Sequence, residues 1–349
     1  MTNFKNISRR DLLKLSANMA LVTFAGASAW VSPVANAADR RIVLGHFGSA
    51  NPQMYGKATS SFEKAFGDGV STEYTSVSSG AQVLSAIAGD SMDICNVGSS
   101  PMVVGFGQGV KSSMVYVQKY ITDSECLIVR KDQDISGIKD LKGKKIGLPF
   151  NTSVHFAMVA ALHDVGLSTG DVQLLNLGAD AITAAWRRQD IDAAYIWVPI
   201  LNGLIDDGGE ILLRTGDLAE SGTLVFDGIV VRDSFKESNP DLVLAYLEEY
   251  ERICSIYRNQ PEQVGEVLSP YLNLTPEVAI AYTDTFHSLP PQDLIQDDWM
   301  GRPGATDTGV LRTLHTQAEF LHEQKQLAAV PESFESFVDS SFLAKMVDG

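Results

Sequence analysis

The stretch Ala86-Ile87-Ala88-Gly89-Asp90, followed by Asp93-Ile94-Cys95, recurs in similar form as residues 185–190 followed by Asp192-Ala193-Ala194. In both places we expect a helix end, an acidic turn and a short strand, and then a helix that begins at a proline, Pro101 or Pro199. The repetition predicts two lobes of similar build. The alternative is a common strand-to-helix connection that occurs twice, and the match itself does not separate the two.

Strand and helix patterns alternate from Arg41 to about residue 215, and the chain is mostly helical from Asn239 onward. This alternation predicts an α/β fold with largely parallel sheets. Glu125–Arg130 and Phe226–Arg232 each contain an acid, an apolar run and a final arginine, and we interpret them as paired hinge strands between the lobes. The expected division is 38–127 and 230–349 for the first lobe and 128–229 for the second.

Residues 1–37 have the features of an export signal. Ser8-Arg9-Arg10-Asp11-Leu12-Leu13-Lys14 is a twin-arginine pattern, an apolar stretch follows, and Ala35-Asn36-Ala37 resembles a cleavage site. A membrane anchor is the alternative, but a span needs roughly 20 strongly apolar residues, and this stretch is short and contains polar residues. We therefore expect export to the periplasm by the twin-arginine route.

The charge balance and the cysteines exclude several classes of function. The chain has 27 basic and 43 acidic residues and a formal net charge of −16, a surface that repels phosphate backbones, so nucleic acid is a poor partner. Cys95, Cys126 and Cys254 have no metal-binding spacing, and we expect buried small hydrophobes and no metal site. The sequence also lacks G-x-S-x-G, H-E-x-x-H, P-loop and dinucleotide-binding motifs. These patterns predict a protein that is not an enzyme and has no cofactor.

Residues 96–101, Asn-Val-Gly-Ser-Ser-Pro, have the composition of an anion cradle at a helix start. The two serines are candidate caps, and Pro101 suits the first helical position. Helices are also expected to begin at Ser79-Gly80 and Thr152-Ser153, again after strands. Because ligands of open α/β sheets bind beyond the carboxyl ends of strands, the three starts are expected to converge on one anion. The alternative for each is an ordinary helix cap.

Acidic and aromatic residues near the same strand ends are candidates for holding a cation. Asp227 precedes a buried strand, where a carboxylate needs a partner, and Glu125 and Asp123 are further acids. Trp197 ends a strand, where an indole can form the wall of a pocket or face an ammonium group. Their alternatives are a capping aspartate and plain core packing. His155, at a helix start, and His46, at a strand end, are the better-placed histidines.

Three segments, 96–101, 185–199 and 226–232, resemble the periplasmic taurine-binding branch of the sulfonate, nitrate and taurine solute-binding family of bacterial ABC importers. The similarity extends over nearly all of 38–349 and includes residues 318–321. The resemblance implies a two-lobed type II periplasmic-binding-protein fold that closes on its ligand by a hinge. It also implies a small sulfonate ligand, an ABC permease and its ATPase as partners, and a monomer.

The resemblance assigns roles by position. Ser99, Ser100 and the helix starts at Gly80 and Thr152 would hold the sulfonate, whereas Asp227 would pair with an ammonium group. Three further substrate-binding candidates stand at matching places: Trp197, Glu125 and His155. The first loop departs from the family pattern, because Phe47 and Asn51 stand where a polar glutamine and an acid are expected. This departure favours a more apolar or bulkier ligand.

Other functions remain open at this stage. The same fold with a longer alkanesulfonate, a sulfate ester, nitrate or an amino acid is the first alternative. An enzyme related to thiamin-pyrimidine synthases is the second, although that family uses a cysteine-rich metal motif that this sequence lacks. A detached ligand domain of a two-component sensor is the third.

Overall fold

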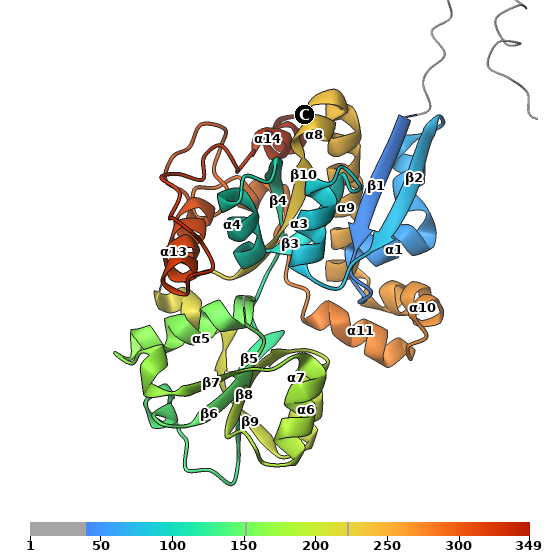
Figure 1. The fold of residues 1–349 in the computed structure, drawn as a ribbon. Helices are drawn as coiled ribbons and strands as arrows, with labels where there is room; N and C mark the ends of the chain where they lie inside the picture. The colour runs from blue at the N-terminus through green and yellow to red at the C-terminus, as the bar shows by residue number, and fades with distance from the viewer. Residues whose placement is uncertain (1–39, 151, 222) are drawn as a thin grey trace, which may run out of the picture. The chain divides into compact units, whose positions relative to one another are not determined.

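The computed structural model describes residues 40–150, 152–221 and 223–349, so the expected export signal lies outside the described residues. The described chain forms two five-stranded sheets, with the strand orders β2-β1-β3-β10-β4 and β7-β6-β8-β5-β9 (Figure 1). In each sheet one strand, β10 or β5, is antiparallel to both of its neighbours, and the other pairings are parallel. The expected largely parallel α/β architecture is confirmed.

The strands of the two sheets and the helices that connect them have the following bounds. The strands are β1 (Arg40–His46), β2 (Val70–Ser76), β3 (Ile94–Gly98), β4 (Ser112–Tyr120), β5 (Glu125–Arg130), β6 (Lys145–Leu148), β7 (Gln173–Asn176), β8 (Ala193–Trp197), β9 (Gly209–Arg214) and β10 (Phe226–Arg232). The helices up to β10 are α1 (Pro52–Thr59), α2 (Ser61–Phe66), α3 (Gly80–Ala88), α4 (Ser99–Gly107), α5 (Ser153–Asp164), α6 (Ala179–Arg187) and α7 (Ile200–Asp206), with 3-10 turns η1 (Ile138–Leu141), η2 (Thr169–Asp171) and η3 (Thr215–Ser221).

The C-terminal third of the chain is helical, as expected. Its helices are α8 (Asp233–Ser238), α9 (Pro240–Asn259), α10 (Pro261–Leu272), α11 (Pro276–Asp284), α12 (Pro291–Leu294), α13 (Gly309–Glu323) and α14 (Ser341–Asp348). Helix α9 packs on α1 and α2, and α13 packs on α4. None of the described helices has the length and apolar character that a bilayer crossing requires.

The predicted internal repeat is confirmed at atomic detail. Asp93 precedes β3, and its carboxylate accepts the Val43 N–H of β1 at 2.8 Å. Asp192 precedes β8, and its carboxylate accepts the Lys145 N–H at the start of β6, also at 2.8 Å. The turn before each aspartate contains a residue other than glycine with positive φ, Asp90 or Gln189. The same local solution therefore joins helix to strand in both lobes.

The two crossings between sheets occur earlier than the sequence predicts. All of β5 pairs in the second sheet and all of β10 pairs in the first. The chain therefore passes to the second sheet within residues 121–124 and is paired in the first sheet again at Phe226, whereas the expected boundaries at 127/128 and 229/230 fall inside these strands. Each strand is paired from its first residue, Glu125 with Trp197 and Phe226 with Tyr120, although the β5–β9 and β10–β4 ladders contain register shifts.

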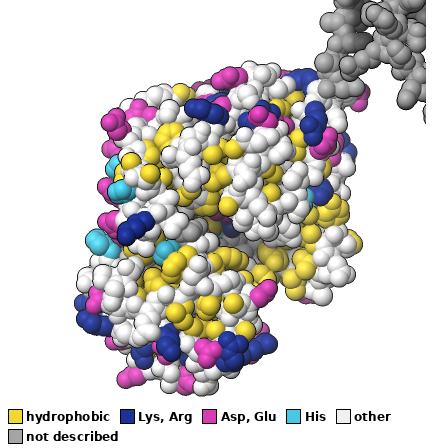
Figure 2. All heavy atoms as spheres, viewed as in Figure 1, with side chains coloured by type: hydrophobic (Ala, Val, Ile, Leu, Met, Phe, Trp, Pro, Cys, Tyr) yellow, Lys and Arg dark blue, Asp and Glu magenta, His cyan; other side chains and the backbone are white. Residues whose placement is uncertain are grey.

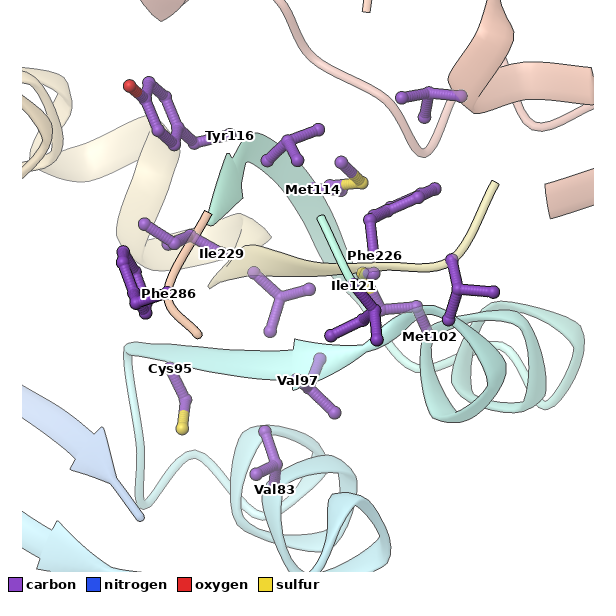
Figure 3. Close-up of a cluster of buried hydrophobic side chains, with 14 of the residues drawn as sticks. Val83, Cys95, Val97, Met102, Met114, Tyr116, Ile121, Phe226, Ile229 and Phe286 are labelled. Atoms are coloured by element: carbon purple, nitrogen blue, oxygen red, sulfur yellow. The ribbon is translucent and has the colours of Figure 1, made fainter. Parts of the chain in front are cut away.

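The core of the first lobe lies between its sheet and the covering helices. Val97, Met102, Met114 and Phe226 are buried side chains of β3, α4, β4 and β10 in this cluster (Figure 3). β3 is buried from Ile94 to Val97, and Asn96 is the polar residue within this otherwise apolar run. All three cysteines are free and buried, so the expectation that they are small core residues is confirmed.

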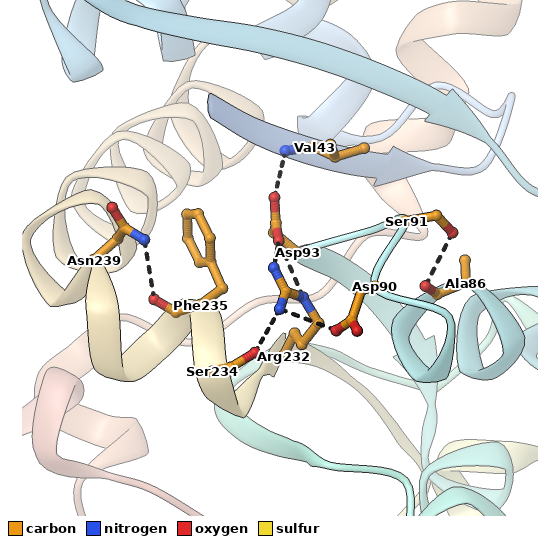
Figure 4. A network of polar contacts seen from close by, with 9 residues as sticks. All are labelled: Val43, Ala86, Asp90, Ser91, Asp93, Arg232, Ser234, Phe235 and Asn239. Carbon is orange, nitrogen blue, oxygen red and sulfur yellow. Dashed lines mark hydrogen bonds and ion pairs between the residues drawn. The ribbon is translucent and has the colours of Figure 1, made fainter. Parts of the chain in front are cut away.

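Arg232 fixes the return strand β10 in the first sheet. Its guanidinium group binds the Asp93 carboxylate, with an Nη2–Oδ1 distance of 2.5 Å, and the Asp90 carboxylate at 3.1 Å (Figure 4). Asp93 is buried and also accepts the Val43 N–H. A buried carboxylate with this many donors is well satisfied, so one side-chain cluster joins β1, the turn before β3 and β10.

Candidate functional site

The start of α4 differs from the expected cap. Gly98 is the N-cap residue, and the two serines and Pro101 occupy the first turn, so Pro101 is third in the helix rather than first. Ser99 Oγ accepts a hydrogen bond from Gln317 Nε2 at 2.8 Å, and Ser100 Oγ donates to Gln317 Oε1 at 3.3 Å. Both serines are buried. In this conformation their hydroxyl groups therefore join α4 to α13 and do not cap the helix.

The start of α3 lies directly against the start of α4. Ser79 is the N-cap of α3, and its hydroxyl accepts the Gln82 N–H at 3.3 Å, as expected. A Cβ atom on Gly80 would lie 2.5 Å from Pro101 Cγ and 2.6 Å from Pro101 Cβ, which is closer than side-chain atoms approach. Gly80 is therefore needed for the close approach of the two helix starts, and both present N–H groups of a first turn.

The start of α5 supplies the corresponding element of the second lobe. Thr152 is the N-cap residue, but its hydroxyl donates to the Pro149 carbonyl oxygen at 2.7 Å and makes no capping bond. Ser153 Oγ donates to Glu125 Oε1 at 2.7 Å. Helix α5 also contacts α4 of the first lobe.

Glu125 is a buried acid at the first position of β5. Its exposed fraction is 7%, and its second carboxylate oxygen, Oε2, is buried without a hydrogen-bond partner. Burial raises the pKa of Glu125 to about 7, and the nearby Asp227 adds to the rise, whereas Ser153 and Lys119 oppose it. A buried carboxyl group with one unsatisfied oxygen is costly to the fold, and such groups are common at functional sites.

Asp227 lies beside Glu125 but already has a cationic partner. Its carboxylate is 3.5 Å from Lys119 Nζ, and both side chains are about four-fifths buried. Asp227 also pairs in the sheet with Gly98, where a Cβ atom would lie 3.4 Å from Asp227 Oδ1. The carboxylate therefore stands next to the N-terminus of α4. The expected partner of a buried aspartate exists, and it is a lysine of this chain.

Trp197 and His155 are the aromatic candidates that the second lobe contributes. Trp197 pairs with Glu125 across the β5–β8 ladder and is half-buried. His155 is buried; its ring stacks on Phe150, with centroids 4.3 Å apart, and meets Phe320 of α13 edge-on at 5.2 Å. Burial lowers the pKa of His155 to about 4, so the imidazole is neutral at physiological pH.

Phe47 and Asn51 stand at the carboxyl end of β1. Phe47 is half-buried against the core of the first lobe. Asn51 caps α1: its Oδ1 accepts the Met54 N–H at 3.0 Å, and its Nδ2 donates to Ser49 Oγ at 3.2 Å. The amide of Asn51 is thus used within its own loop, which leaves Phe47 as the loop residue with side-chain surface to offer a ligand.

Sequence reasoning missed Lys119 and Gln317 as members of this region. Lys119 is the penultimate residue of the strand β4, where a lysine is easily interpreted as exposed. Gln317 had one available signal: it stands on the face of α13 that also bears Ala318 and Leu321, which are buried. Figure 2, which has the same viewpoint as Figure 1, shows a hollow in the molecular surface that is flanked by apolar side chains. The arrangement offers helix N–H groups for an anion and carboxylates for a cation.

Comparison with known proteins gives the family. Residues 67–264 match the family described as NMT1/THI5 like. Over 305 residues the chain is 31% identical to the taurine-binding periplasmic protein of Escherichia coli strain K12, covering 84% of this chain and 90% of that protein. The chain belongs to the NMT1/THI5-like family. The resemblance expected from the three sequence segments is thereby confirmed.

Solved structures of other proteins share the fold of this family member. The periplasmic aliphatic sulphonate binding protein SsuA from Escherichia coli has a TM-score of 0.75 at 19% identity, covering 87% of this chain and 99% of that chain. The two-lobed periplasmic-binding-protein fold is thereby confirmed. The desulfurization enzyme DSZB also matches, with a TM-score of 0.60 at 16% identity over 88% of this chain and 99% of that one. The fold alone therefore does not separate a receptor from an enzyme.

Proposed function

We propose that this protein is a non-catalytic solute receptor that captures taurine or a similarly small organosulfonate in the periplasm and delivers it to an ABC permease. The observation on which this rests is that the starts of α3 and α4 pack against each other and that Ser153, at the start of α5, binds the buried Glu125, in a chain that is 31% identical to a taurine-binding periplasmic protein. A small zwitterion has the matching charges, one at each end.

The sulfonate is assigned to the first turns of α3, α4 and α5. N–H groups of a first helical turn lack partners within the helix and bear partial positive charge. Gly80 allows the first turns of α3 and α4 to approach each other closely, because a side chain at this position would overlap Pro101. Since Gln317 binds the hydroxyl groups of Ser99 and Ser100, we expect the anion contacts at α4 to come mainly from its backbone.

The ammonium group is assigned to Asp227 and Glu125, with Trp197 as the wall. Asp227 shares its charge with Lys119 at 3.5 Å, whereas Glu125 Oε2 has no partner. Asp227 lies close enough to Glu125 to raise the pKa of that acid. An arriving ammonium group therefore gains a free acceptor at Glu125 and shares Asp227 with the lysine.

We expect Phe47 to determine the size and polarity of the ligand that the site accepts. The family pattern has a polar residue at this position, and the neighbouring Asn51 amide is already hydrogen-bonded within its loop. A ligand with a somewhat larger or more apolar body, such as a short alkanesulfonate, is therefore a second candidate within the same class.

Export and partners follow from the same assignment. We propose that the twin-arginine segment directs the folded chain to the periplasm, that the receptor acts as a monomer, and that it docks on a permease driven by an ATPase. Relatives named as periplasmic binding proteins support this location. Detection of the chain in a periplasmic fraction, and its loss when Arg9 and Arg10 are both replaced by lysine, tests the route.

Isothermal titration of the purified protein tests the ligand. Taurine is compared with ethanesulfonate, which lacks the amine, and with β-alanine, which has a carboxylate in place of the sulfonate. We expect a dissociation constant for taurine near the micromolar range, about −8 kcal/mol, and weaker binding of β-alanine. The Asp227→Ala variant is expected to lose taurine affinity while it stays folded. Taurine binding equal to that of the wild type would refute the role of Asp227.

A further inference from the structure

Glu125 has an unusual position for an acid in this fold. It begins β5, directly after the four residues by which the chain crosses from the first sheet to the second. Its side chain is more than nine-tenths buried. Ser153 Oγ donates to Oε1 at 2.7 Å, whereas Oε2 has no partner. Oε2 therefore has no donor that replaces the water molecules to which it is hydrogen-bonded in the unfolded chain.

The charges around Glu125 do not neutralise it. Lys119 from β4 and Asp227 from β10 form an ion pair with each other at 3.5 Å, so the charge of Lys119 is already shared. From the second lobe, α5 contributes the hydroxyl of Ser153, and β8 contributes the phenol of Tyr195, whose pKa is raised chiefly by burial and further by Glu125. When Glu125 is ionised, this group of side chains has one surplus negative charge.

We propose that Glu125 sorts sulfonates into two classes by its own protonation: amino sulfonates bind with the carboxylate ionised, and simple alkanesulfonates bind with the carboxyl group neutral. This inference rests on the proposed function and adds a rule of selectivity to it. The site then accepts both classes, and ambient pH decides which class it prefers.

The chemistry of the two forms supports this division. An ionised carboxylate only accepts hydrogen bonds, so an ammonium group satisfies Oε2 and cancels the surplus charge. A simple sulfonate adds a second negative charge to the same place, which a buried site disfavours. A protonated carboxyl group instead has an O–H group that can donate to a sulfonate oxygen.

Protons balance in both cases. When an amino sulfonate binds to the protonated receptor, Glu125 releases one proton to solvent. When a simple alkanesulfonate binds to the ionised receptor, Glu125 takes up one proton from solvent. Because burial raises the pKa of Glu125 to about 7, both forms of the free receptor are populated near neutral pH.

The test is isothermal titration of the full chain with taurine and with ethanesulfonate between about pH 5.5 and about pH 8, each in two buffers of different ionisation enthalpy. Taurine affinity is expected to rise with pH by up to about 30-fold over this range, and ethanesulfonate affinity is expected to fall by up to about 10-fold. The buffers are expected to report proton release with taurine and proton uptake with ethanesulfonate. Dissociation constants that change in the same direction for both ligands, or not at all, would overturn the proposal.

Two variants localise the effect. Glu125→Gln is expected to abolish both pH dependences. His287→Asn is the matched control, because the His287 imidazole contacts Asp123, two residues before Glu125, at 2.9 Å; the opposite pH dependences are expected to persist in this variant. If they vanish there instead, the assignment to Glu125 is wrong. If neither sulfonate binds the wild type, the proposed function itself fails.

Discussion

Replacing Glu125 with glutamine is expected to stabilise the ligand-free protein at alkaline pH and to have little effect at acid pH. The side chain is 7% exposed, and burial raises its pKa from 4.5 to about 7. The folded state therefore holds a proton that the unfolded state has released between these two values. Stability contributed by the wild-type residue is present below about pH 4.5 and is lost as pH rises through about 7.

The magnitude follows from the size of the shift. A rise of about 2.5 pKa units corresponds to about 3 kcal/mol of differential interaction. Glutamine is uncharged at every pH and keeps an acceptor for Ser153, so it avoids this penalty. The variant is expected to unfold with a free energy about 3 kcal/mol higher than the wild type at pH 8, and with a nearly equal value near pH 4.5.

Urea denaturation followed by circular dichroism at several pH values measures this difference. Other titrating groups, such as His155, contribute to both proteins, so the difference between variant and wild type isolates Glu125. A difference that stays constant from about pH 4.5 to about pH 8, or a variant that is less stable at alkaline pH, would refute the reasoning that burial of an unpaired carboxylate raises its pKa.

Three further substitutions test the packing and electrostatics of the site. Gly80→Ala forces a methyl group against Pro101, and we expect a loss of about 1–3 kcal/mol in unfolding free energy, measured by denaturation beside an alanine at exposed Gly178, which has open space. Gln317→Leu removes the partner of two buried hydroxyl groups and is expected to cost about 2–5 kcal/mol; equal melting temperatures would contradict this. His155→Phe is expected to gain about 1–2 kcal/mol over the wild type near pH 5, because the buried histidine, with its pKa lowered to about 4, loses stability as pH falls below about 6.5; a gain confined to alkaline pH would reverse the argument.

The alternating strands and helices were predictable because their signals are local. Buried strands such as β8 have continuous apolar sequences, and the N-cap residues of α3 and α5 directly precede their helices. The repeated turn before Asp93 and Asp192 was also predictable. In both lobes an aspartate just before a strand accepts a backbone N–H of the neighbouring strand, so the same residue type recurs at the same place in the sequence. Helix α1 escaped prediction, since its start depends on Asn51 as a cap within a polar loop.

The details of the site were less predictable because they depend on residues far apart in the chain. Ser99 and Ser100 have the composition of a helix cap, but Gln317, more than 200 residues later, binds both hydroxyl groups. The partner of Asp227 is likewise set by the antiparallel register of β10 and β4, which places Lys119 opposite. The residues next to these side chains in the sequence do not indicate such long-range partners. The two serine hydroxyl groups and the Asp227 carboxylate were therefore expected to bind a ligand.

A crystal structure of the protein with taurine is the most direct test of the central claim. The account predicts one taurine molecule between the lobes. Its sulfonate oxygens are expected within hydrogen-bond distance of N–H groups at the starts of α3, α4 and α5, and its amine beside Glu125 and Asp227. A taurine bound elsewhere, or bound in the opposite orientation with its amine at the helix starts, would contradict the account.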